Sequence, residues 1–155
     1  MKTLTKQQQG KASRRKGKKF EQATYHFLNN LGYFVTKWGN NVDLIINPPQ
    51  LTISKGNRFH TPTGFPDYLA FKPINKTTPI RYEVILVECK INNTLDKKEK
   101  LQLNHYQYTL NIPCYICYPH PQTNQPTLRK HTKYTPNPNH KHTPKYTPNP
   151  NQKQP

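Results

Sequence analysis

Two carboxylates and a lysine are spaced so that strand pairing could bring them together. Asp67 follows Gly64-Phe65-Pro66 and precedes a short apolar run, whereas Glu88 and Lys90 close a longer apolar run. Two anionic carboxylates a few ångströms apart repel each other, and a hard divalent cation such as Mg²⁺ relieves that repulsion. A protonated lysine beside them can stabilise an anion that develops during a reaction. The three residue types therefore suit metal-assisted hydrolysis.

Residues 82–91 predict the strand that positions Glu88 and Lys90. This stretch is β-branched or apolar nearly throughout and has no Gly or Pro, which favours a strand buried on both faces. Because side chains alternate along a strand, Glu88 and Lys90 should share one face and Cys89 the other. A hairpin from Asp67 to Lys90 would place the two carboxylates together. Their burial is costly unless they pair with a lysine, a metal or water.

Asp43 competes with Asp67 for the role of first carboxylate, because it also lies in an apolar run, residues 42–46. We favour Asp67, since Asp43 lacks a preceding proline and would need a long insertion between the two strands of the site. Residues 47–63, which include two consecutive prolines, predict a loop or loose hairpin that covers the cleft.

Residues 13–31 predict the first helix, because apolar side chains recur there at helical spacing and Gly32 follows as a C-terminal cap. Glu21 adjoins the apolar stripe of this helix. Two interpretations stay open: Glu21 is a solvated residue paired with a nearby lysine such as Lys18, or it is a further acidic member of the site. Residues 33–38 predict the strand that follows.

Residues 96–110 predict a second helix, which Pro113 and a strand over residues 114–118 follow, so that an α/β unit is completed. Three cysteines lie in strand-like runs, where we expect reduced, buried thiols. A zinc site at Cys114 and Cys117 is the weaker alternative, because no second ligand pair with suitable spacing completes it. The third cysteine is Cys89.

The pairing of Pro66-Asp67 with Glu88-Cys89-Lys90 resembles the motif of the PD-(D/E)XK nuclease superfamily. Within it, the chain is most similar to archaeal-type Holliday junction resolvases and VRR-type nuclease domains. Residues 14–21 look like their basic opening and helix-borne glutamate, and residues 95–118 look like their closing helix and strand. The resemblance covers residues 13–118 and implies an α/β, restriction-endonuclease-like fold, in which a mixed central sheet is flanked by helices.

The resemblance also implies an activity: Mg²⁺-dependent hydrolysis of phosphodiester bonds in DNA, in branched structures such as Holliday junctions, during DNA recombination or repair. Asp67, Glu88 and Lys90 would be the catalytic residues. The cation, with Mn²⁺ as a substitute, would be held by Asp67, Glu88, Glu21 and the carbonyl of Cys89. A symmetric homodimer would cut two matching strands of a junction.

Two further groups of residues take roles from the resemblance. VRR-type relatives often place a glutamine on the closing helix; His105 occupies that place here, with Gln102 and Gln107 nearby, although a core or surface histidine is the plainer interpretation of His105. The basic opening would contact DNA through Arg14, Arg15, Lys16, Lys18 and Lys19.

Charge is distributed unevenly along the 155 residues, which carry a net charge of +17. Residues 1–19 contain eight Lys or Arg and no acid, and residues 119–155 contain six and no acid. The stretch between them carries ten bases and all seven acids. Basic segments around a nearly balanced domain favour a polyanionic partner, of which nucleic acid is the first choice and an anionic membrane surface the second. We expect residues 1–12 to form a flexible basic arm.

Residues 119–155 predict a disordered tail, because they are rich in Pro, Asn and Lys and nearly free of aliphatic side chains. Residues 133–139 recur as residues 145–151, a period of twelve. No apolar stretch has membrane-spanning length and no signal-peptide core is present, so we expect an intracellular, cytoplasmic protein. A non-catalytic DNA-binding protein, in which Glu88 and Lys90 merely pair, is the alternative function.

Overall fold

The first helix, α1 (Lys6–Asn30), is longer than predicted. The computed structural model describes residues 5–54 and 64–136. Helix α1 begins at a capping box in which the Gln8 N–H donates to the Thr5 hydroxyl and the Thr5 N–H donates to Gln8 Oε1. It ends before Gly32, whose φ is 84°. The predicted flexible arm over residues 1–12 is therefore wrong for residues 6–12, which the Thr5 cap includes in the helix.

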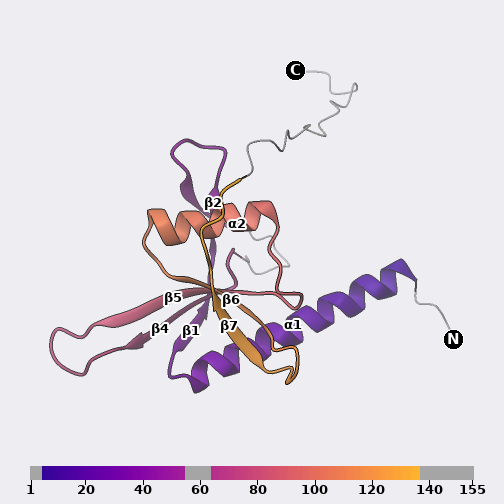
Figure 1. Ribbon diagram of the computed structural model, residues 1–155, viewed down its shortest axis with the longest axis horizontal. Helices are drawn as coiled ribbons and strands as arrows, with labels where there is room; N and C mark the ends of the chain where they lie inside the picture. Colours follow the sequence, from indigo (N-terminus) through magenta and orange to yellow (C-terminus); the bar gives the residue numbers. More distant parts are fainter. Residues whose placement is uncertain (1–4, 55–63, 137–155) are drawn as a thin grey trace.

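A mixed five-stranded sheet forms the centre of the fold (Figure 1). Its strand order is β1-β4-β5-β6-β7, and only β5 and β6 run parallel. The predicted α/β class with a mixed sheet is confirmed. The strands are β1 (Phe34–Lys37), β4 (Tyr68–Pro73), β5 (Tyr82–Cys89), β6 (Cys114–Pro119) and β7 (Pro126–Lys130).

Alternation along β5 divides the core between the two faces of the sheet. Ile85 and Val87 pack in one apolar cluster with Leu28 of α1, whereas Leu86 packs in a second cluster with Leu103 of α2 (Lys97–Asn104). Helices α1 and α2 accordingly lie on opposite sides of the sheet in Figure 1. A π-helical turn, η1 (His105–Thr109), continues α2 and adds Tyr106 to the second cluster.

A separate hairpin of β2 (Asn40–Asp43) and β3 (Gln50–Ile53) occupies much of the region predicted as a loop or loose hairpin. Val42 anchors it in the cluster of α2. Residues 55–63 lie outside the described residues, and with them part of the predicted cover of the cleft.

The predicted disordered tail is wrong for the stretch that contains β7. This strand pairs antiparallel with β6, and Leu128 packs against the cluster of α1. An edge strand needs apolar side chains on one face only, so its pattern was too weak to predict. Residues 137–155, which include the second copy of the repeat, lie outside the described residues.

Within residues 5–54 and 64–136, no helix is long and apolar enough to cross a membrane. The three cysteines are free thiols, as predicted; Cys114 and Cys117 are buried and Cys89 is half-buried.

Candidate active site

Asp67 and Glu88 lie side by side where β4 begins and β5 ends. The two strands are antiparallel with Tyr68 opposite Val87, so the residues that flank this pair also meet. The Asp67 N–H donates to Glu88 Oε2 at 3.2 Å, and the Cys89 N–H donates to Asp67 Oδ2 at 2.9 Å. The hairpin thus holds both carboxylates through backbone hydrogen bonds.

The turn before Asp67 is fixed by pairing with the chain that follows β1. The Gly64 N–H donates to the Trp38 carbonyl, the Phe65 N–H to the Asn40 carbonyl, and the Trp38 N–H to the Asp67 carbonyl, at 3.0–3.1 Å. A Cβ at Gly64 would lie 2.4 Å from the Asn40 carbonyl oxygen and 2.6 Å from that of Trp38. Glycine is therefore required here by the close approach of two backbones, and the turn holds Asp67 in place without a ligand.

Both carboxylates favour the protonated form more than usual. Burial and, to a smaller extent, the charge of the neighbouring Asp67 raise the pKa of Glu88, and Lys90 lowers it. The result of these effects together is a pKa of about 8. Burial likewise raises the pKa of Asp67, although the Cys89 N–H acts in the opposite direction. An added cation would relieve this electrostatic cost.

Lys90 lies between two carboxylates. Its Nζ is 3.1 Å from Glu88 Oε1, and it also donates to Glu99 Oε1 in the first turn of α2. Burial lowers the pKa of Lys90, but the hydrogen bond to Glu99 and the charge of Glu88 outweigh it, so that the pKa is raised overall. Lys90 is therefore a protonated donor.

Glu99 was not predicted as a site residue. Its other oxygen accepts the Asp96 N–H, while the Asp96 carboxylate accepts the Glu99 N–H, and together they form the capping box of α2. The D-x-x-E spacing could have indicated a helix start. It could not have indicated that the helix brings Glu99 against Lys90, because that contact depends on how α2 packs on the sheet.

A second lysine, Lys37 of β1, joins Glu21 to Asp67 from the α1 side of the sheet. Its Nζ lies 2.6 Å from Glu21 Oε2, 4.0 Å from Asp67 Oδ1 and 4.2 Å from the centre of the Tyr68 ring. Burial lowers the pKa of Lys37, but Glu21 and Asp67 raise it overall. Glu21 therefore pairs with Lys37 rather than with the predicted Lys18, and it approaches Asp67 through that ammonium group.

Among the described residues, Asp43 has no hydrogen bond or ion pair with Asp67, Glu88 or Lys90. Its Oδ1 accepts the Ile45 N–H, and it lines a pocket of about 750 Å³ between β2 and α2 that Glu99 also lines. Gln102 is buried in the same region and donates to the Val42 carbonyl at 3.3 Å. The structure thus brings Asp67, and not Asp43, to Glu88.

The other accessory residues have structural contacts. His105 is buried at the end of α2, next to the core residue Tyr106. Gln107 donates to the His131 carbonyl at 3.0 Å and accepts the Cys114 N–H at 3.2 Å. Neither contacts Asp67, Glu88 or Lys90 in any interaction of the described residues.

The residues around Asp67 fit a hard cation through two carboxylates. Within the described ranges, no three His, Cys, Asp or Glu side chains gather as a ready metal cluster. Mg²⁺ is commonly held by one or two carboxylates, with water and substrate phosphates completing its coordination. Asp67 and Glu88 supply such a pair, and Glu21 could join them only by releasing Lys37.

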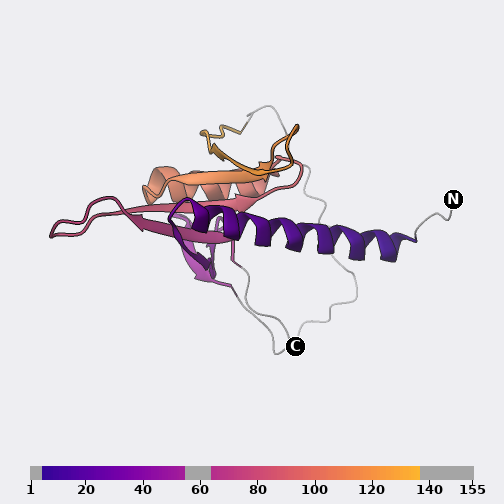
Figure 2. The ribbon, with the colours of Figure 1, turned by 90° about the horizontal axis from the view of Figure 1, so that it is seen from below.

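The predicted DNA-binding residues lie on the first half of α1, which extends beyond the sheet (Figure 2). Residues 6–19 carry seven Lys or Arg and no acid, and the only buried residues of α1, Thr24 and Leu28, lie nearer its C-terminus. The ion pairs of the described residues involve none of these bases. Their positive charge is therefore uncompensated.

Comparison with protein-family models, with curated proteins and with solved structures finds no match for this chain. The function proposed below therefore rests on the chemistry of the site and on the resemblance of the sequence motif.

Proposed function

We propose that this protein is a metal-dependent DNA endonuclease that hydrolyses phosphodiester bonds, with branched DNA such as a Holliday junction as its substrate. The observation that carries the proposal is that Asp67 and Glu88 meet at the end of a strand hairpin, where the Asp67 N–H donates to the Glu88 carboxylate and Lys90 lies 3.1 Å from Glu88. It is the arrangement that the resemblance to PD-(D/E)XK nucleases implies.

Each residue has a role in this proposal. Asp67 and Glu88 hold Mg²⁺ or Mn²⁺, and the Cys89 carbonyl and Glu21 are the further donors that the resemblance implies. The bound cation would activate water and offset charge on the scissile phosphate. Lys90, which its two carboxylates keep protonated, donates to the attacking water or to the phosphate oxygens in the transition state.

The basic half of α1 supplies affinity for the DNA backbone. Lysine and arginine side chains that neutralise phosphates release condensed counterions, which gives binding without sequence preference. Two copies of the chain, related by a two-fold axis, would present two sites to the matching strands of a junction. The homodimer is part of the proposal because a junction must be cut twice.

A non-catalytic DNA-binding protein is the second candidate, and one observation favours it. Lys37 lies between Glu21 and Asp67, while Lys90 pairs with Glu88. Each carboxylate of the hairpin thus has an ammonium group nearby, which would suit a structural ion-pair network with no cation.

The deciding experiment is cleavage of labelled four-way junctions and linear duplexes in Mg²⁺ and in EDTA. Wild type should cut only with the metal. Asp67→Asn should lose at least about a thousandfold in rate, since a metal ligand is removed, yet bind the junction within a few fold. Asp43→Asn is the matched control and should stay active.

Absence of metal-dependent cleavage by wild type would leave the non-catalytic candidate. Equal rates for wild type and Asp67→Asn would refute the assignment of the site, and an inactive Asp43→Asn with an active Asp67→Asn would show that the other aspartate is the ligand.

A further inference from the structure

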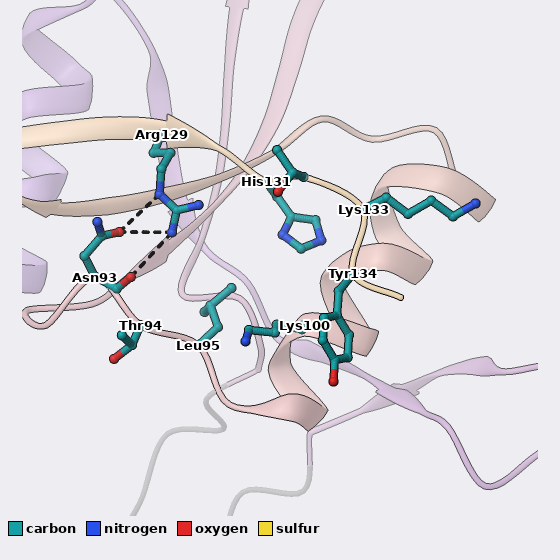
Figure 3. Close-up of a pocket in the computed structure, with 9 residues that line it drawn as sticks. Asn93, Thr94, Leu95, Lys100, Arg129, His131, Lys133 and Tyr134 are labelled. Atoms are coloured by element: carbon teal, nitrogen blue, oxygen red, sulfur yellow. Dashed lines mark hydrogen bonds between the residues drawn. The ribbon is translucent and has the colours of Figure 1, made fainter. Parts of the chain in front are cut away.

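A basic pocket lies between the loop after β5, helix α2 and the segment that follows β7. Its volume is about 330 Å³, near the lower end of the range typical of small-molecule sites. Figure 3 shows Arg129, His131, Lys100 and Tyr134 around one space, whereas the side chain of Lys133 runs away from it. The Nζ of Lys133 lies 5.9 Å from the centre of the Tyr108 ring, outside the pocket lining. The pocket is lined by Asn93, Thr94, Leu95, Lys100, Arg129, His131, Thr132, Lys133 and Tyr134.

The charge of the pocket is uncompensated. Lys100, Arg129 and Lys133 line it, and none of the seven acids of the chain does. The ion pairs of the described residues include none of these three cations. Burial lowers the pKa of His131, and Arg129 lowers it further, so that histidine stays neutral at pH 7. Three cations without an acid favour an anionic ligand.

The guanidinium of Arg129 is held in place although the residue is exposed. Its Nε and Nη2 donate to the side-chain oxygen of Asn93 at 3.3 and 3.0 Å, and Nη2 also donates to the Asn93 carbonyl at 3.4 Å. Figure 3 shows these three bonds. They use neutral acceptors, so they orient the guanidinium group without neutralising it.

Asn104 of α2 fixes the other wall of the pocket. Its Oδ1 accepts the Tyr134 N–H at 3.0 Å and lies 2.9 Å from His131 Nε2, and its Nδ2 donates to the Tyr134 carbonyl at 2.6 Å. Residues 131–134 are therefore tied to the helix, and Tyr134 keeps its place beside Lys100.

An aromatic ring accompanies the cations. The Nζ of Lys100 lies 5.1 Å from the centre of the Tyr134 ring, so an aromatic surface and an ammonium group adjoin in one pocket. Proteins that hold single-stranded nucleic acid combine cations along the backbone with aromatic rings on which bases stack. A duplex keeps its bases stacked on one another and could not offer one to Tyr134.

We propose that this pocket binds one nucleotide unit of a single-stranded nucleic acid, with the phosphate between Lys100 and Arg129 and the base against Tyr134. The site is separate from Asp67 and Glu88 and does not require that the chain be a nuclease.

The pocket offers closely matched control variants. Lys97 lies on the same helix as Lys100 and is similarly half-buried, and Lys130 is exposed like its neighbour Arg129, but neither Lys97 nor Lys130 lines the pocket. The pocket pair Lys100→Gln with Arg129→Gln therefore removes the same charge as the control pair Lys97→Gln with Lys130→Gln. The full chain is used, and melting temperatures verify that all variants fold.

The first measurement is fluorescence anisotropy with labelled decathymidylate over a range of salt. The pocket pair should bind about tenfold more weakly and flatten the slope of log affinity against log salt by roughly 0.7, the contribution of one phosphate contact on a single strand. The control pair should stay within about twofold of wild type. Equal losses in the two pairs would overturn the proposal, because only net charge would then matter.

The second measurement separates the sources of the phosphate and tests the aromatic contact. Unlabelled decathymidylate should displace the probe at far lower nucleotide concentration than thymidine 5′-monophosphate or inorganic phosphate. If thymidine 5′-monophosphate displaced the probe at the lower concentration, and if its binding were lost in the pocket pair, the proposal of a single-stranded ligand would be overturned. The pocket would then be assigned to a free nucleotide. Photo-cross-linking with a 5-iodouracil decamer should label Tyr134, and Tyr134→Phe should keep the affinity that Tyr134→Leu loses. Equal affinity of these two variants would overturn the stacking contact.

Discussion

The carboxylate site and the basic pocket lie at the two ends of one short loop, and they treat charge in opposite ways. At the site, Glu88 is buried and Asp67 is half-buried, and each has a lysine nearby, Lys90 and Lys37 respectively. At the pocket, three cations gather with no acid beside them. The net charge of the chain alone therefore does not show where an anionic partner binds. At the site the carboxylates and lysines neutralise one another, whereas in the pocket the positive charges have no acid to neutralise them.

The two regions also differ in how they are built. Backbone pairing of β4 with β5 and the Gly64 turn fix the site. Side-chain amides fix the pocket, where Asn93 and Asn104 hold Arg129 and residues 131–134. A region held by backbone pairing should tolerate substitution of side chains, whereas one held by two asparagines should not.

The largest expected effect comes from removing the wall of the pocket. Truncation after Pro119 deletes β7, uncovers the edge of β6 and removes the packing of Leu128. We expect the melting temperature to fall by about 10 °C or more, equivalent to a few kcal/mol. Truncation after Pro136 is the control and should melt close to wild type, because residues 137–155 contain no aliphatic side chain.

Circular dichroism melts of the two truncated proteins provide the comparison. Equal melting temperatures would mean that β7 contributes nothing to stability and that the pocket wall is dispensable for the fold.

Glu88→Gln should give the next largest effect, and its sign depends on pH. The pKa of Glu88 is raised from 4.5 to about 8 in the folded protein, so its contribution to stability is complete below pH 4.5 and is lost as pH rises through 8. The variant lacks this ionisation and should exceed wild type by ~2 kcal/mol in free energy of unfolding at pH 9, with little difference at pH 4.

Urea unfolding at both pH values measures this difference, and Glu83→Gln on the same strand is the control. The hydrogen bond from Tyr33 lowers the pKa of Glu83, so its contribution is present at high pH and is lost on acidification. The two variants should therefore depart from wild type in opposite directions at pH 9. A shared direction would contradict the burial argument for Glu88.

Much of the site geometry follows from the sequence. Strict alternation along residues 82–89 predicts that Glu88 and Lys90 share a face, and the hairpin predicts that Asp67 meets them. The contacts of Lys37 with Glu21 and of Lys90 with Glu99 do not follow, because they depend on how α1 and α2 pack on opposite faces of the sheet. Local patterns state which face a residue takes but not which helix will cover it.

The first helix and the last strand also differ in how far local sequence patterns predict them. Thr5 and Gln8 make a local cap that a sequence can reveal, yet residues 6–11 carry no apolar side chain, so the apolar spacing predicts a start at residue 13 and not at Lys6. Strand β7 depends on the edge of β6 for its hydrogen bonds, and its own residues carry little pattern.

A moderate effect is expected from substitution of Glu99. Lys90 of the carboxylate site is paired with Glu88 and Glu99, whereas the lysines that line the pocket have no such ion pair within the described residues. Glu99→Gln keeps an acceptor for the Asp96 N–H, so helix α2 should stay capped. It removes the charge that raises the pKa of Lys90, so the alkaline limb of metal-dependent cleavage should move to lower pH. At pH values above the alkaline limb, we expect Glu99→Gln to cleave about tenfold more slowly than wild type, equivalent to about 1.4 kcal/mol.

The pH profile of single-turnover cleavage is the measurement, with melting temperature as the check on the cap. An unmoved alkaline limb would show that Glu99 has only a structural role.

The smallest effect concerns α1. Replacing Arg14, Arg15 and Lys16 with Gln should flatten the salt slope on duplex DNA by up to roughly 2.7, at about 0.9 per phosphate contact. Cleavage at saturating protein should persist, because the site is intact. Replacing Lys72, Lys76 and Arg81 removes the same charge from the β4–β5 hairpin, whose tip projects away from the start of α1 in Figure 1. Equal slopes for the two triple variants would show that α1 has no special part in binding.

The native thiols permit a labelling strategy. Burial raises the pKa of Cys89, Cys114 and Cys117, so little thiolate is available to react with maleimides or iodoacetamides near pH 7. A cysteine introduced at an exposed position, such as Lys130, would be far more reactive than all three. A fluorophore could then be attached beside the pocket of the otherwise native chain, and the arrival of a strand could be timed directly.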